Sequence, residues 1–313
     1  MSDWRILVSD GLSAGGLDIL KAAAQVDDKP GINADELLAT AAEYDAFVIR
    51  GRTKVTAAVF EAATKLKAVG RAGVGVDNID LAAARAKGVT VVNAPKSTSL
   101  AVAELALGMM FAVARRIPFA DATMKQGQWE KKKLEGIELA GKTLGVIGMG
   151  NIGSAVAQRA AALGMQVVGY DPLVPADEIA RRGAAPSALA DLYAQADFIT
   201  IHIPLTPDSK NMLSGQAFAQ MKRGVRLIDA ARGGVVDETA LLGALESGQV
   251  AAAALDVFTT EPPGLTALVA HPNVIATPHI GAQTEEAQTR AGDDIASEVL
   301  AALRGEPLRW KIV

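Results

Sequence analysis

Cysteine is absent from this 313-residue chain, and histidine occurs only three times. Without cysteine the chain can form no disulfide, no thiolate nucleophile and no thiolate metal site. The three histidines are scattered and none lies in an acidic cluster, so we expect no metal centre. Aromatic residues make up only 4% of the chain, which leaves Ala, Val, Leu and Ile to build the core.

The chain also lacks a basic excess and a membrane-spanning stretch. Its formal net charge of −4 argues against a nucleic-acid partner, because a phosphate-binding face usually shows as a surplus of Lys and Arg. The longest apolar run, residues 100–114, is interrupted by Glu104 and is shorter than the roughly 20 residues of a spanning helix. The N-terminus reads as a strand rather than a signal peptide. We therefore predict a cytoplasmic protein that does not bind membranes.

Short Val- and Ile-rich runs alternate along the chain with Ala-rich helical stretches, which predicts an α/β protein of two domains. A helix is expected after Asn33, which has Glu36 three places on in a capping-box spacing, and another after Thr284. Apolar runs without strict alternation are typical of strands buried on both faces of a parallel sheet. The predicted strands are residues 5–8, 46–50, 66–70 and 89–93, and then 143–148, 166–171, 197–203, 225–230, 251–257 and 273–277.

A glycine loop follows the predicted strand 143–148 and precedes an Ala-rich helix. Gly148, Gly150 and Gly153 have the G-x-G-x-x-G spacing of a dinucleotide-binding turn. In such a turn the first glycine permits the sharp bend, the second admits the pyrophosphate, and the third lets helix and strand pack closely. The helix N-terminus would supply free N–H groups to the anion.

Asp171 ends the next predicted strand, 21 positions after Gly150. This is close to the expected separation for the acid that accepts hydrogen bonds from the adenosine ribose. A carboxylate there would repel a 2′-phosphate, so the sequence favours NAD over NADP.

Arg232, Glu261 and His279 each follow a later predicted strand of the same sheet. The carboxyl ends of parallel strands meet at one edge, so these three side chains can reach one site. A guanidinium can bind a carboxylate, an imidazole can exchange a proton with a hydroxyl, and a neighbouring carboxylate orients the ring and favours the imidazolium. The combination suits hydride transfer at a 2-hydroxy acid, with His279 as the acid–base. Of the other histidines, His202 is expected to line the cofactor crevice and His271 to lie in a turn.

With these motifs in place, the chain resembles the NAD-dependent D-2-hydroxyacid dehydrogenase family, and most closely its phosphoglycerate dehydrogenase branch. The resemblance covers essentially the whole chain. It is carried by GRAGVGVDNIDL (70–81), VVNAP (91–95), KTLGVIGMGNIG (142–153), ARGGVVDETAL (231–241), AALDVFTTEPP (253–263) and PHIGAQTEEAQ (278–288).

The resemblance implies two doubly wound parallel-sheet domains, in which a Rossmann-type NAD-binding domain (99–284) is inserted in a flavodoxin-like substrate domain (1–98 plus 285–313). It implies NAD as cofactor and Arg232, Glu261 and His279 as the catalytic set. Further contacts with the cofactor are implied at Asn151, Ile152, Asp171, Pro172, His202, Pro204, Thr206, Ala230, Ala231, Asp256 and Gly281.

For the substrate, the resemblance implies carboxylate binding by the backbone around Val74 and Gly75, with Asn93 nearby. Arg50 and Arg52 stand where phosphoglycerate enzymes use arginine for the phosphate. Lys131 matches a basic position that reaches a neighbouring subunit's substrate in the family, although the run 131–133 could equally be a solvated charge run. The family also implies a homodimer, or a tetramer, and the apolar helix 100–114 is expected to help form it.

The chain departs from the family pattern in three places. Asn151 stands where many relatives have Arg, which removes a cation beside the pyrophosphate. Asp229 stands where Asn or Ser is frequent, with no evident consequence. The sequence ends without the C-terminal regulatory domain of longer relatives, so feedback inhibition by serine through such a domain is not expected.

The implied reaction is oxidation of 3-phospho-D-glycerate to 3-phosphohydroxypyruvate, the first step of serine biosynthesis. Two alternatives remain open at this point. One is a glyoxylate/hydroxypyruvate reductase or another D-2-hydroxyacid dehydrogenase on the same scaffold. The other, more distant, is an NAD-sensing binding protein that keeps the catalytic residues.

Overall fold

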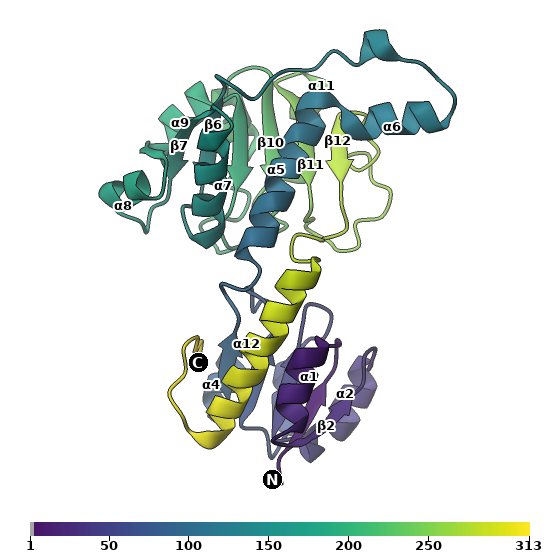
Figure 1. The fold of residues 1–313 in the computed structure, drawn as a ribbon, viewed down its shortest axis with the longest axis vertical. Helices are drawn as coiled ribbons and strands as arrows, with labels where there is room; N and C mark the ends of the chain where they lie inside the picture. The colour runs from purple at the N-terminus through teal and green to yellow at the C-terminus, as the bar shows by residue number, and fades with distance from the viewer. Residues whose placement is uncertain (1–2) are drawn as a thin grey trace. The chain divides into compact units, whose positions relative to one another are not determined.

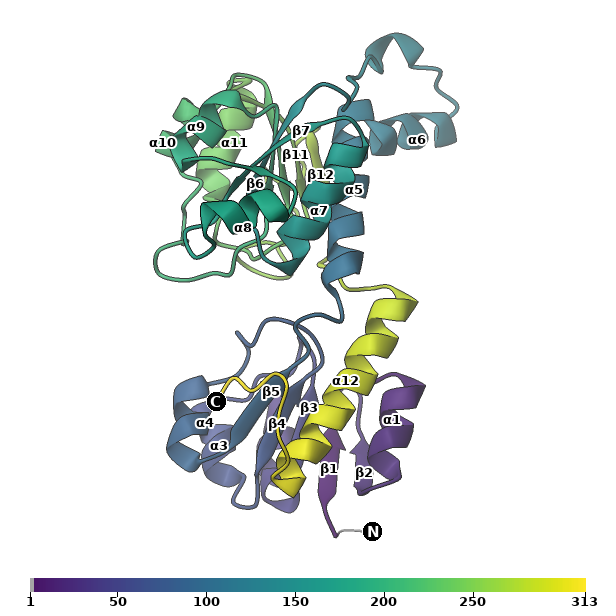
Figure 2. The ribbon, with the colours of Figure 1, turned by 60° about the vertical axis from the view of Figure 1, so that its left-hand side comes forward.

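The computed structural model describes residues 3–313 and separates them into two compact units. Unit 1 comprises Met1–Ser99 and Ala282–Val313, and unit 2 comprises Leu100–Gly281. Each unit has its own parallel sheet with helices on both faces (Figures 1 and 2). The predicted fold class is confirmed.

Unit 1 is built on a five-stranded sheet of order β2-β1-β3-β4-β5, the flavodoxin-like order. Helix α12 packs on β4 so closely that a Cβ added to Gly70 would lie 2.3 Å from Val299 Cγ2. The capping box at Asn33 and Glu36 is present at the start of α2, as predicted. The elements are β1 Arg5–Val8, α1 Ala14–Lys21, β2 Gln25–Asp28, α2 Ala34–Thr40, β3 Ala46–Ile49, α3 Ala57–Ala62, β4 Ala68–Arg71, α4 Leu81–Lys87, β5 Thr90–Asn93 and α12 Glu285–Arg304.

Unit 2 is built on a seven-stranded parallel sheet of order β12-β11-β10-β9-β6-β7-β8. Counted from β6, this is the dinucleotide-binding order with one added strand at the edge. The elements are α5 Ser99–Arg115, α6 Ile117–Lys125, β6 Thr143–Ile147, α7 Asn151–Ala162, β7 Gln166–Tyr170, α8 Ala176–Arg181, β8 Ala185–Pro186, α9 Leu189–Gln195, β9 Phe198–Ile201, α10 Gly215–Gln220, β10 Val225–Asp229, α11 Glu238–Glu246, β11 Val250–Leu255 and β12 Val274–Ala276.

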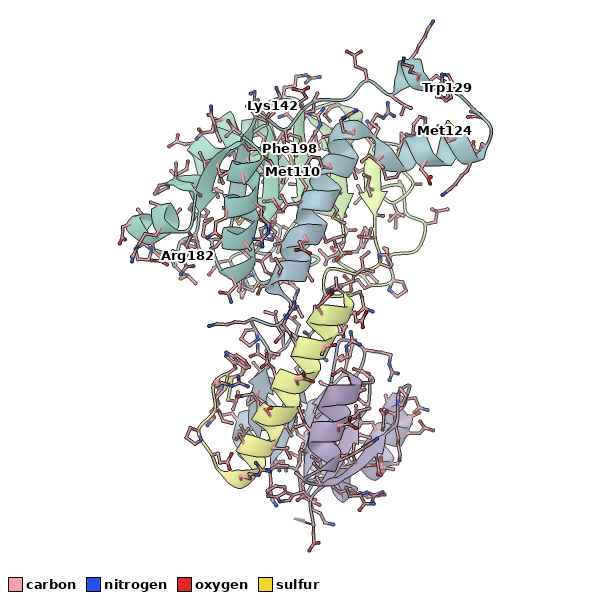
Figure 3. The ribbon with its side chains drawn as sticks, viewed as in Figure 1. Met110, Met124, Trp129, Lys142, Arg182 and Phe198 are labelled. Atoms are coloured by element: carbon pink, nitrogen blue, oxygen red, sulfur yellow. The ribbon has the colours of Figure 1, made fainter. Side chains whose placement is uncertain are left out.

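Two hydrophobic clusters hold the sheet of unit 2 between its helix layers. The layer on the α5 and α7 side includes Met110 and Phe198, both fully buried and labelled in Figure 3. The opposite layer packs α9, α10 and α11 on the other face. The central strands are therefore buried on both faces, as their unbroken apolar runs predicted.

Two strands were not predicted, and both lie at sheet edges. β2 has the sequence QVDD, with its first and last residues exposed, and β8 is only the dipeptide Ala185–Pro186. Edge strands are stabilised by backbone pairing on one side only and need little apolar character, so hydrophobic patterning does not find them.

Within residues 3–313, no helix is both long enough and apolar enough to cross a membrane. The same residues contain no group of three or more His, Cys, Asp or Glu side chains placed to hold a metal ion.

Candidate active site

The predicted site residues of unit 2 gather at the carboxyl edge of its sheet. Each lies in a loop or turn that follows a different strand, and all the strands are parallel. The glycine loop follows β6, Asp171 follows β7, His202 follows β9, Arg232 follows β10, Asp256 follows β11, and His279 follows β12.

Two glycines of the loop are required by the fold itself. Gly148 has a φ of +93°, and a Cβ there would lie 2.5 Å from the carbonyl oxygen of His202. A Cβ on Gly153 would lie 1.9 Å from the carbonyl oxygen of Gly148, so only glycine lets α7 approach β6 this closely.

Gly150 differs from the other two. Its φ of −71° is open to any residue, and no heavy atom of the described residues lies within 4 Å of a Cβ added there. It is the N-cap of α7, yet it has no side chain to accept from the first N–H groups of the helix. Open space and free N–H donors at a helix start fit the pyrophosphate of a dinucleotide.

Asp171 ties the end of β7 to the glycine loop. Its Oδ2 accepts the Met149 N–H at 2.8 Å and its Oδ1 accepts the Leu173 N–H at 2.9 Å. An ionised carboxylate offers about four acceptor positions, so both oxygens can still accept from ribose hydroxyls.

His202 is a neutral side chain that lacks one partner. Burial of the ring lowers the pKa of His202 to about 3. Nε2 lies 2.9 Å from Thr200 Oγ1, whereas the buried Nδ1 has no hydrogen-bond partner within residues 3–313. Buried polar atoms are nearly always hydrogen-bonded, so the orphaned Nδ1 fits contact with a bound molecule.

The imidazole of His279 and the carboxylate of Glu261 form a direct pair, with Nδ1 2.8 Å from Oε2. Burial alone would raise the pKa of Glu261, but the hydrogen bonds from His279 and from the Phe258 N–H, together with the charges of His279 and Arg232, outweigh it and lower that pKa. The carboxylate is therefore ionised at neutral pH. With Nδ1 engaged by Glu261, Nε2 is the nitrogen free to exchange a proton.

Arg232 completes this group from the loop after β10. Its Nη1 donates to the carbonyl of Ala231 at 2.7 Å, and its charge contributes to the lowered pKa of Glu261. The next residue, Gly233, packs so tightly that a Cβ would lie 1.8 Å from the Phe258 carbonyl oxygen. The loops that carry Arg232 and Glu261 are therefore in direct contact.

Asp256 has a structural task that the sequence did not reveal. It is 1% exposed, and its Oδ1 accepts from Thr277 Oγ1 at 2.6 Å and from the Ile280 N–H at 2.8 Å, while Oδ2 accepts from the Gly281 N–H at 2.8 Å. Its carbonyl accepts the N–H of His279, whose φ is +51°. Asp256 thus holds the loop that presents His279. Its role as a cofactor contact stays a prediction.

The remaining predicted cofactor residues lie in the same loops. Asn151 and Ile152 form the first turn of α7, and Pro172 follows Asp171. Ser209 closes the turn that begins at Pro204 by donating to its carbonyl at 2.7 Å and by accepting the Thr206 N–H at 2.8 Å. Ala230 and Ala231 connect β10 to Arg232.

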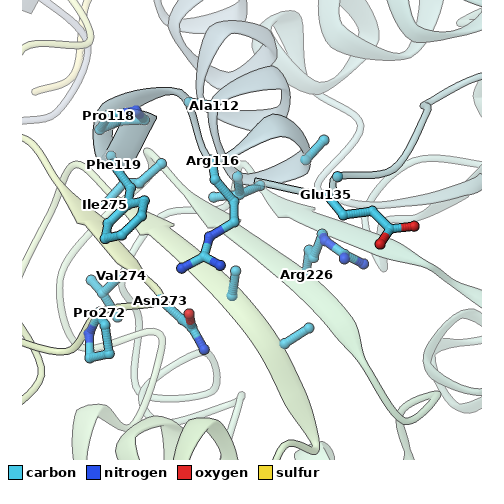
Figure 4. Close-up of a pocket in the computed structure, with 15 residues that line it drawn as sticks. Ala112, Arg116, Pro118, Phe119, Glu135, Arg226, Pro272, Asn273, Val274 and Ile275 are labelled. Carbon is cyan, nitrogen blue, oxygen red and sulfur yellow. The ribbon is translucent and has the colours of Figure 1, made fainter. Parts of the chain in front are cut away.

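A separate pocket lies at the amino ends of β10, β11 and β12, whereas the predicted site residues follow the carboxyl ends of the strands. Figure 4 shows Arg116, from the turn between α5 and α6, and Arg226, from the start of β10, among the side chains that line it. Pro272 and Asn273 come from the turn that precedes β12. None of the predicted site residues lines this pocket, so we do not assign it to the reaction.

The predicted substrate residues of unit 1 follow β3, β4 and β5. Arg50 comes directly after β3, and its Nη2 donates to Gln283 Oε1 at 2.9 Å. Asn93 ends β5, donates to the Val74 carbonyl at 2.6 Å beside Gly75, and has a buried Oδ1 without a partner in the described chain.

The two arginines predicted to bind phosphate differ in their surroundings. Arg52 donates to the carbonyls of Ile32 and Ser9 and forms an ion pair with Asp10 at 3.1 Å. Its guanidinium therefore ties loops of unit 1 together, and Arg50 is the better placed of the two for a ligand.

Lys131 is exposed at the start of the 3₁₀ turn Lys131–Lys133, and Glu130 pairs with Lys133 rather than with Lys131. Figure 3 shows Trp129 in the segment that follows α6. Lys131 lines a surface pocket with Met124, Trp129 and Glu138, and no other predicted site residue lines it.

Many known proteins are similar to this chain in sequence and in structure. The NAD-binding-domain model of the D-isomer specific 2-hydroxyacid dehydrogenases matches residues 107–281. A D-3-phosphoglycerate dehydrogenase from Rattus norvegicus is 50% identical over 97% of this chain and 57% of its own length, and one from Methanocaldococcus jannaschii is 48% identical over 96% and 58%. The chain thus spans little more than half the length of these relatives.

Solved structures share the fold of this chain over nearly the full length of both chains. The TT0316 protein of Thermus thermophilus superposes with a TM-score of 0.90 at 35% identity, covering 99% of this chain and 100% of its own. A glyoxylate reductase from Paecilomyes thermophila also reaches 0.90, at 28% identity, covering 100% and 99%.

Proposed function

Because the chain belongs to the D-isomer specific 2-hydroxyacid dehydrogenase family, we propose that it transfers hydride between NAD and a D-2-hydroxy acid, with His279 as acid–base. The observation that carries the proposal is the 2.8 Å pair of His279 and Glu261, with the charge of Arg232 acting on the same carboxylate. Orphaned donors at the start of α7 and the partnerless Nδ1 of His202 support a dinucleotide at this edge.

Each side chain has a distinct task in the proposed reaction. Bound NAD supplies the hydride acceptor. Arg232 binds the substrate carboxylate, Glu261 fixes the ring and stabilises the imidazolium, and Nε2 of His279 takes the hydroxyl proton as the 2-oxo acid forms. In the reverse direction the same nitrogen returns the proton.

We assign the substrate as 3-phospho-D-glycerate, oxidised to 3-phosphohydroxypyruvate as the first step of serine biosynthesis. The support is the identity to D-3-phosphoglycerate dehydrogenases and the presence of Arg50 beside Gln283. A phosphate ester carries nearly two negative charges near neutral pH, so one well-placed guanidinium discriminates strongly for it. Val74, Gly75 and Asn93 remain the proposed carboxylate contacts.

Arg50→Ala is expected to lower kcat/KM for 3-phosphohydroxypyruvate about a hundredfold, because a charge-assisted pair to the phosphate is lost. The measurement is a steady-state panel of 3-phosphohydroxypyruvate, hydroxypyruvate and glyoxylate, with NADH and NADPH in parallel. Turnover of glyoxylate, which has no phosphate, is the internal control and should change little. An unchanged preference for the phosphorylated substrate would remove the assignment.

The second candidate is a glyoxylate/hydroxypyruvate reductase, favoured by the full-length similarity to the Paecilomyes thermophila enzyme. The same panel separates the two, because that reductase would prefer the unphosphorylated acids in the unaltered chain. Tight NADH binding without turnover of any 2-oxo acid would instead support an NAD-sensing protein.

We propose a cytoplasmic homodimer, formed along α5. The exposed positions of α5 repeat at helical spacing, namely Leu100, Glu104, Gly108, Phe111 and Arg115. Phe111 is 40% exposed, and a Cβ on Gly108 would meet no described atom within 4 Å, so the middle of this stripe is flat and open to a second helix. Exposed Ile117, Met124 and Trp129 continue the apolar surface along α6 and the segment after it.

Gly108→Arg is expected to convert the dimer to a monomer, because a long side chain would stand between two closely packed helices. Light scattering at micromolar concentration gives the mass. Gly108→Ala is the matched control and should remain dimeric. A monomeric unaltered protein would contradict the proposal.

A further inference from the structure

Asp229 is a buried carboxylate that the proposed reaction does not use. It is 2% exposed and is the last residue of β10, paired with Ile201 of β9 and Leu255 of β11. Its Oδ1 accepts the Ala231 N–H at 3.0 Å, which fixes the two-residue turn leading to Arg232.

The charged groups around Asp229 come from three elements. Asp256 directly follows β11, and its N–H donates to the Asp229 carbonyl at 2.8 Å. Glu238 begins α11, and Arg232 follows β10 itself. On the β9 side the titratable group is His202, whose ring is neutral and bonded to Thr200. Arg232 is the cation that acts on Asp229.

We propose that Asp229 is a positioning residue whose ionisation sets how strongly Arg232 attracts the carboxylate of a bound acid. When Asp229 is neutral, it does not offset the attraction between Arg232 and the ligand. When Asp229 is ionised, its buried negative charge acts on Arg232 and offsets part of that attraction. This inference rests on the proposed role of Arg232 in binding the substrate carboxylate.

The change in charge falls near neutral pH. Burial raises the pKa of Asp229 to about 7, with Asp256 and Glu238 acting in the same direction and with the Ala231 N–H and the charge of Arg232 opposing them. Below this value the folded protein holds the proton, and above it the buried carboxylate is ionised. Because coupling is reciprocal, a carboxylate bound at Arg232 also favours proton uptake by Asp229.

Oxalate is a suitable probe because both of its carboxylates are ionised throughout the range tested. Its dissociation constant would be measured on the NADH-loaded protein from pH 6.0 to 8.5 by quenching of NADH fluorescence. Asp229→Asn is isosteric and can still accept the Ala231 N–H, but it carries no charge. His279→Gln removes the imidazole proposed to contact the ligand, so the Asp229 contribution is isolated in that background.

In the His279→Gln background we expect oxalate affinity to fall about threefold or more as the pH rises through 7, because the negative charge of Asp229 then offsets part of the attraction of Arg232 for oxalate. In Asp229→Asn/His279→Gln this dependence should disappear. Equal pH slopes in the two variants would overturn the proposal. If Arg232→Ala left oxalate binding unchanged, the proposed role of Arg232 would be wrong, and the Asp229 proposal with it. If Arg232→Ala weakened oxalate binding but the two pH slopes were equal, only the Asp229 proposal would be wrong.

Thermal unfolding gives a second readout that needs no ligand. An acid whose pKa is raised by folding destabilises the native state most strongly above that raised pKa, because there the folded protein must bury the ionised carboxylate. Asp229→Asn should therefore raise Tm by roughly 5 °C at pH 8.5 and by clearly less at pH 5.5. A pH-independent difference in Tm would show that Asp229 does not change its charge in this range and would overturn the proposal.

Discussion

His279→Gln is expected to lower kcat by about 10²–10⁴-fold, because it removes the group that accepts the hydroxyl proton. Glutamine keeps the size and hydrogen-bonding capacity of the side chain but cannot carry a proton between pH 5 and 9. The imidazole does not contact the glycine loop, so the dissociation constant for NADH should change little. Steady-state kinetics and NADH fluorescence titration measure the two quantities separately.

Glu261→Gln is the matched variant for this experiment. It retains a hydrogen-bond partner for Nδ1 at a distance like the present 2.8 Å but removes the negative charge that stabilises the imidazolium. Its loss in kcat should be smaller than that of His279→Gln. If His279→Gln retained more than a tenth of the original kcat, the acid–base would have to be another group.

Gly150→Ala and Gly153→Ala are expected to give opposite results, although both change the same loop by one methyl group. At Gly150 a Cβ meets no atom of the described chain, so the free energy of unfolding should stay within about 0.5 kcal/mol. NAD affinity should nevertheless fall more than tenfold, because the methyl group occupies the space in which the pyrophosphate approaches the backbone.

Gly153→Ala should instead lower the free energy of unfolding by about 3 kcal/mol, because its Cβ would lie 1.9 Å from the Gly148 carbonyl oxygen and the helix would have to shift. Chemical denaturation and NAD titration of the same two samples separate the effects. Loss of stability in Gly150→Ala, or unchanged NAD affinity in that variant, would contradict the dinucleotide assignment of the loop.

Much of the fold could be read from local patterns. The strands of both sheets are short apolar runs bounded by polar or glycine residues, and burial on two faces makes such runs unmistakable. The starts of α2 and α12 were predicted from the N-cap residues Asn33 and Thr284. In the structure each of these side chains accepts a hydrogen bond from the N–H three residues later. The edge strands β2 and β8 were not predicted from the sequence because backbone pairing, rather than side-chain character, keeps them in place.

The glycine spacing was visible in the sequence, but the reason for each glycine was not. Gly148 and Gly153 are needed because other backbone atoms lie where their Cβ atoms would be, whereas Gly150 faces open space. Spacing alone cannot distinguish these cases, because the clashing atoms at Gly148 belong to His202 and Ile203, which are distant along the chain.

The sequence by itself determined the two α/β units, the dinucleotide loop and the three side chains that suit hydride transfer, because periodicity, spacing and residue chemistry are local properties. Tertiary structure alone decided how those groups act on one another. It placed Glu261 on Nδ1 of His279, used Asp256 to hold the loop that carries that imidazole, and buried Asp229 where its charge acts on Arg232. Burial and electrostatic coupling depend on distances between strand ends, and those distances exist only once the sheet has formed.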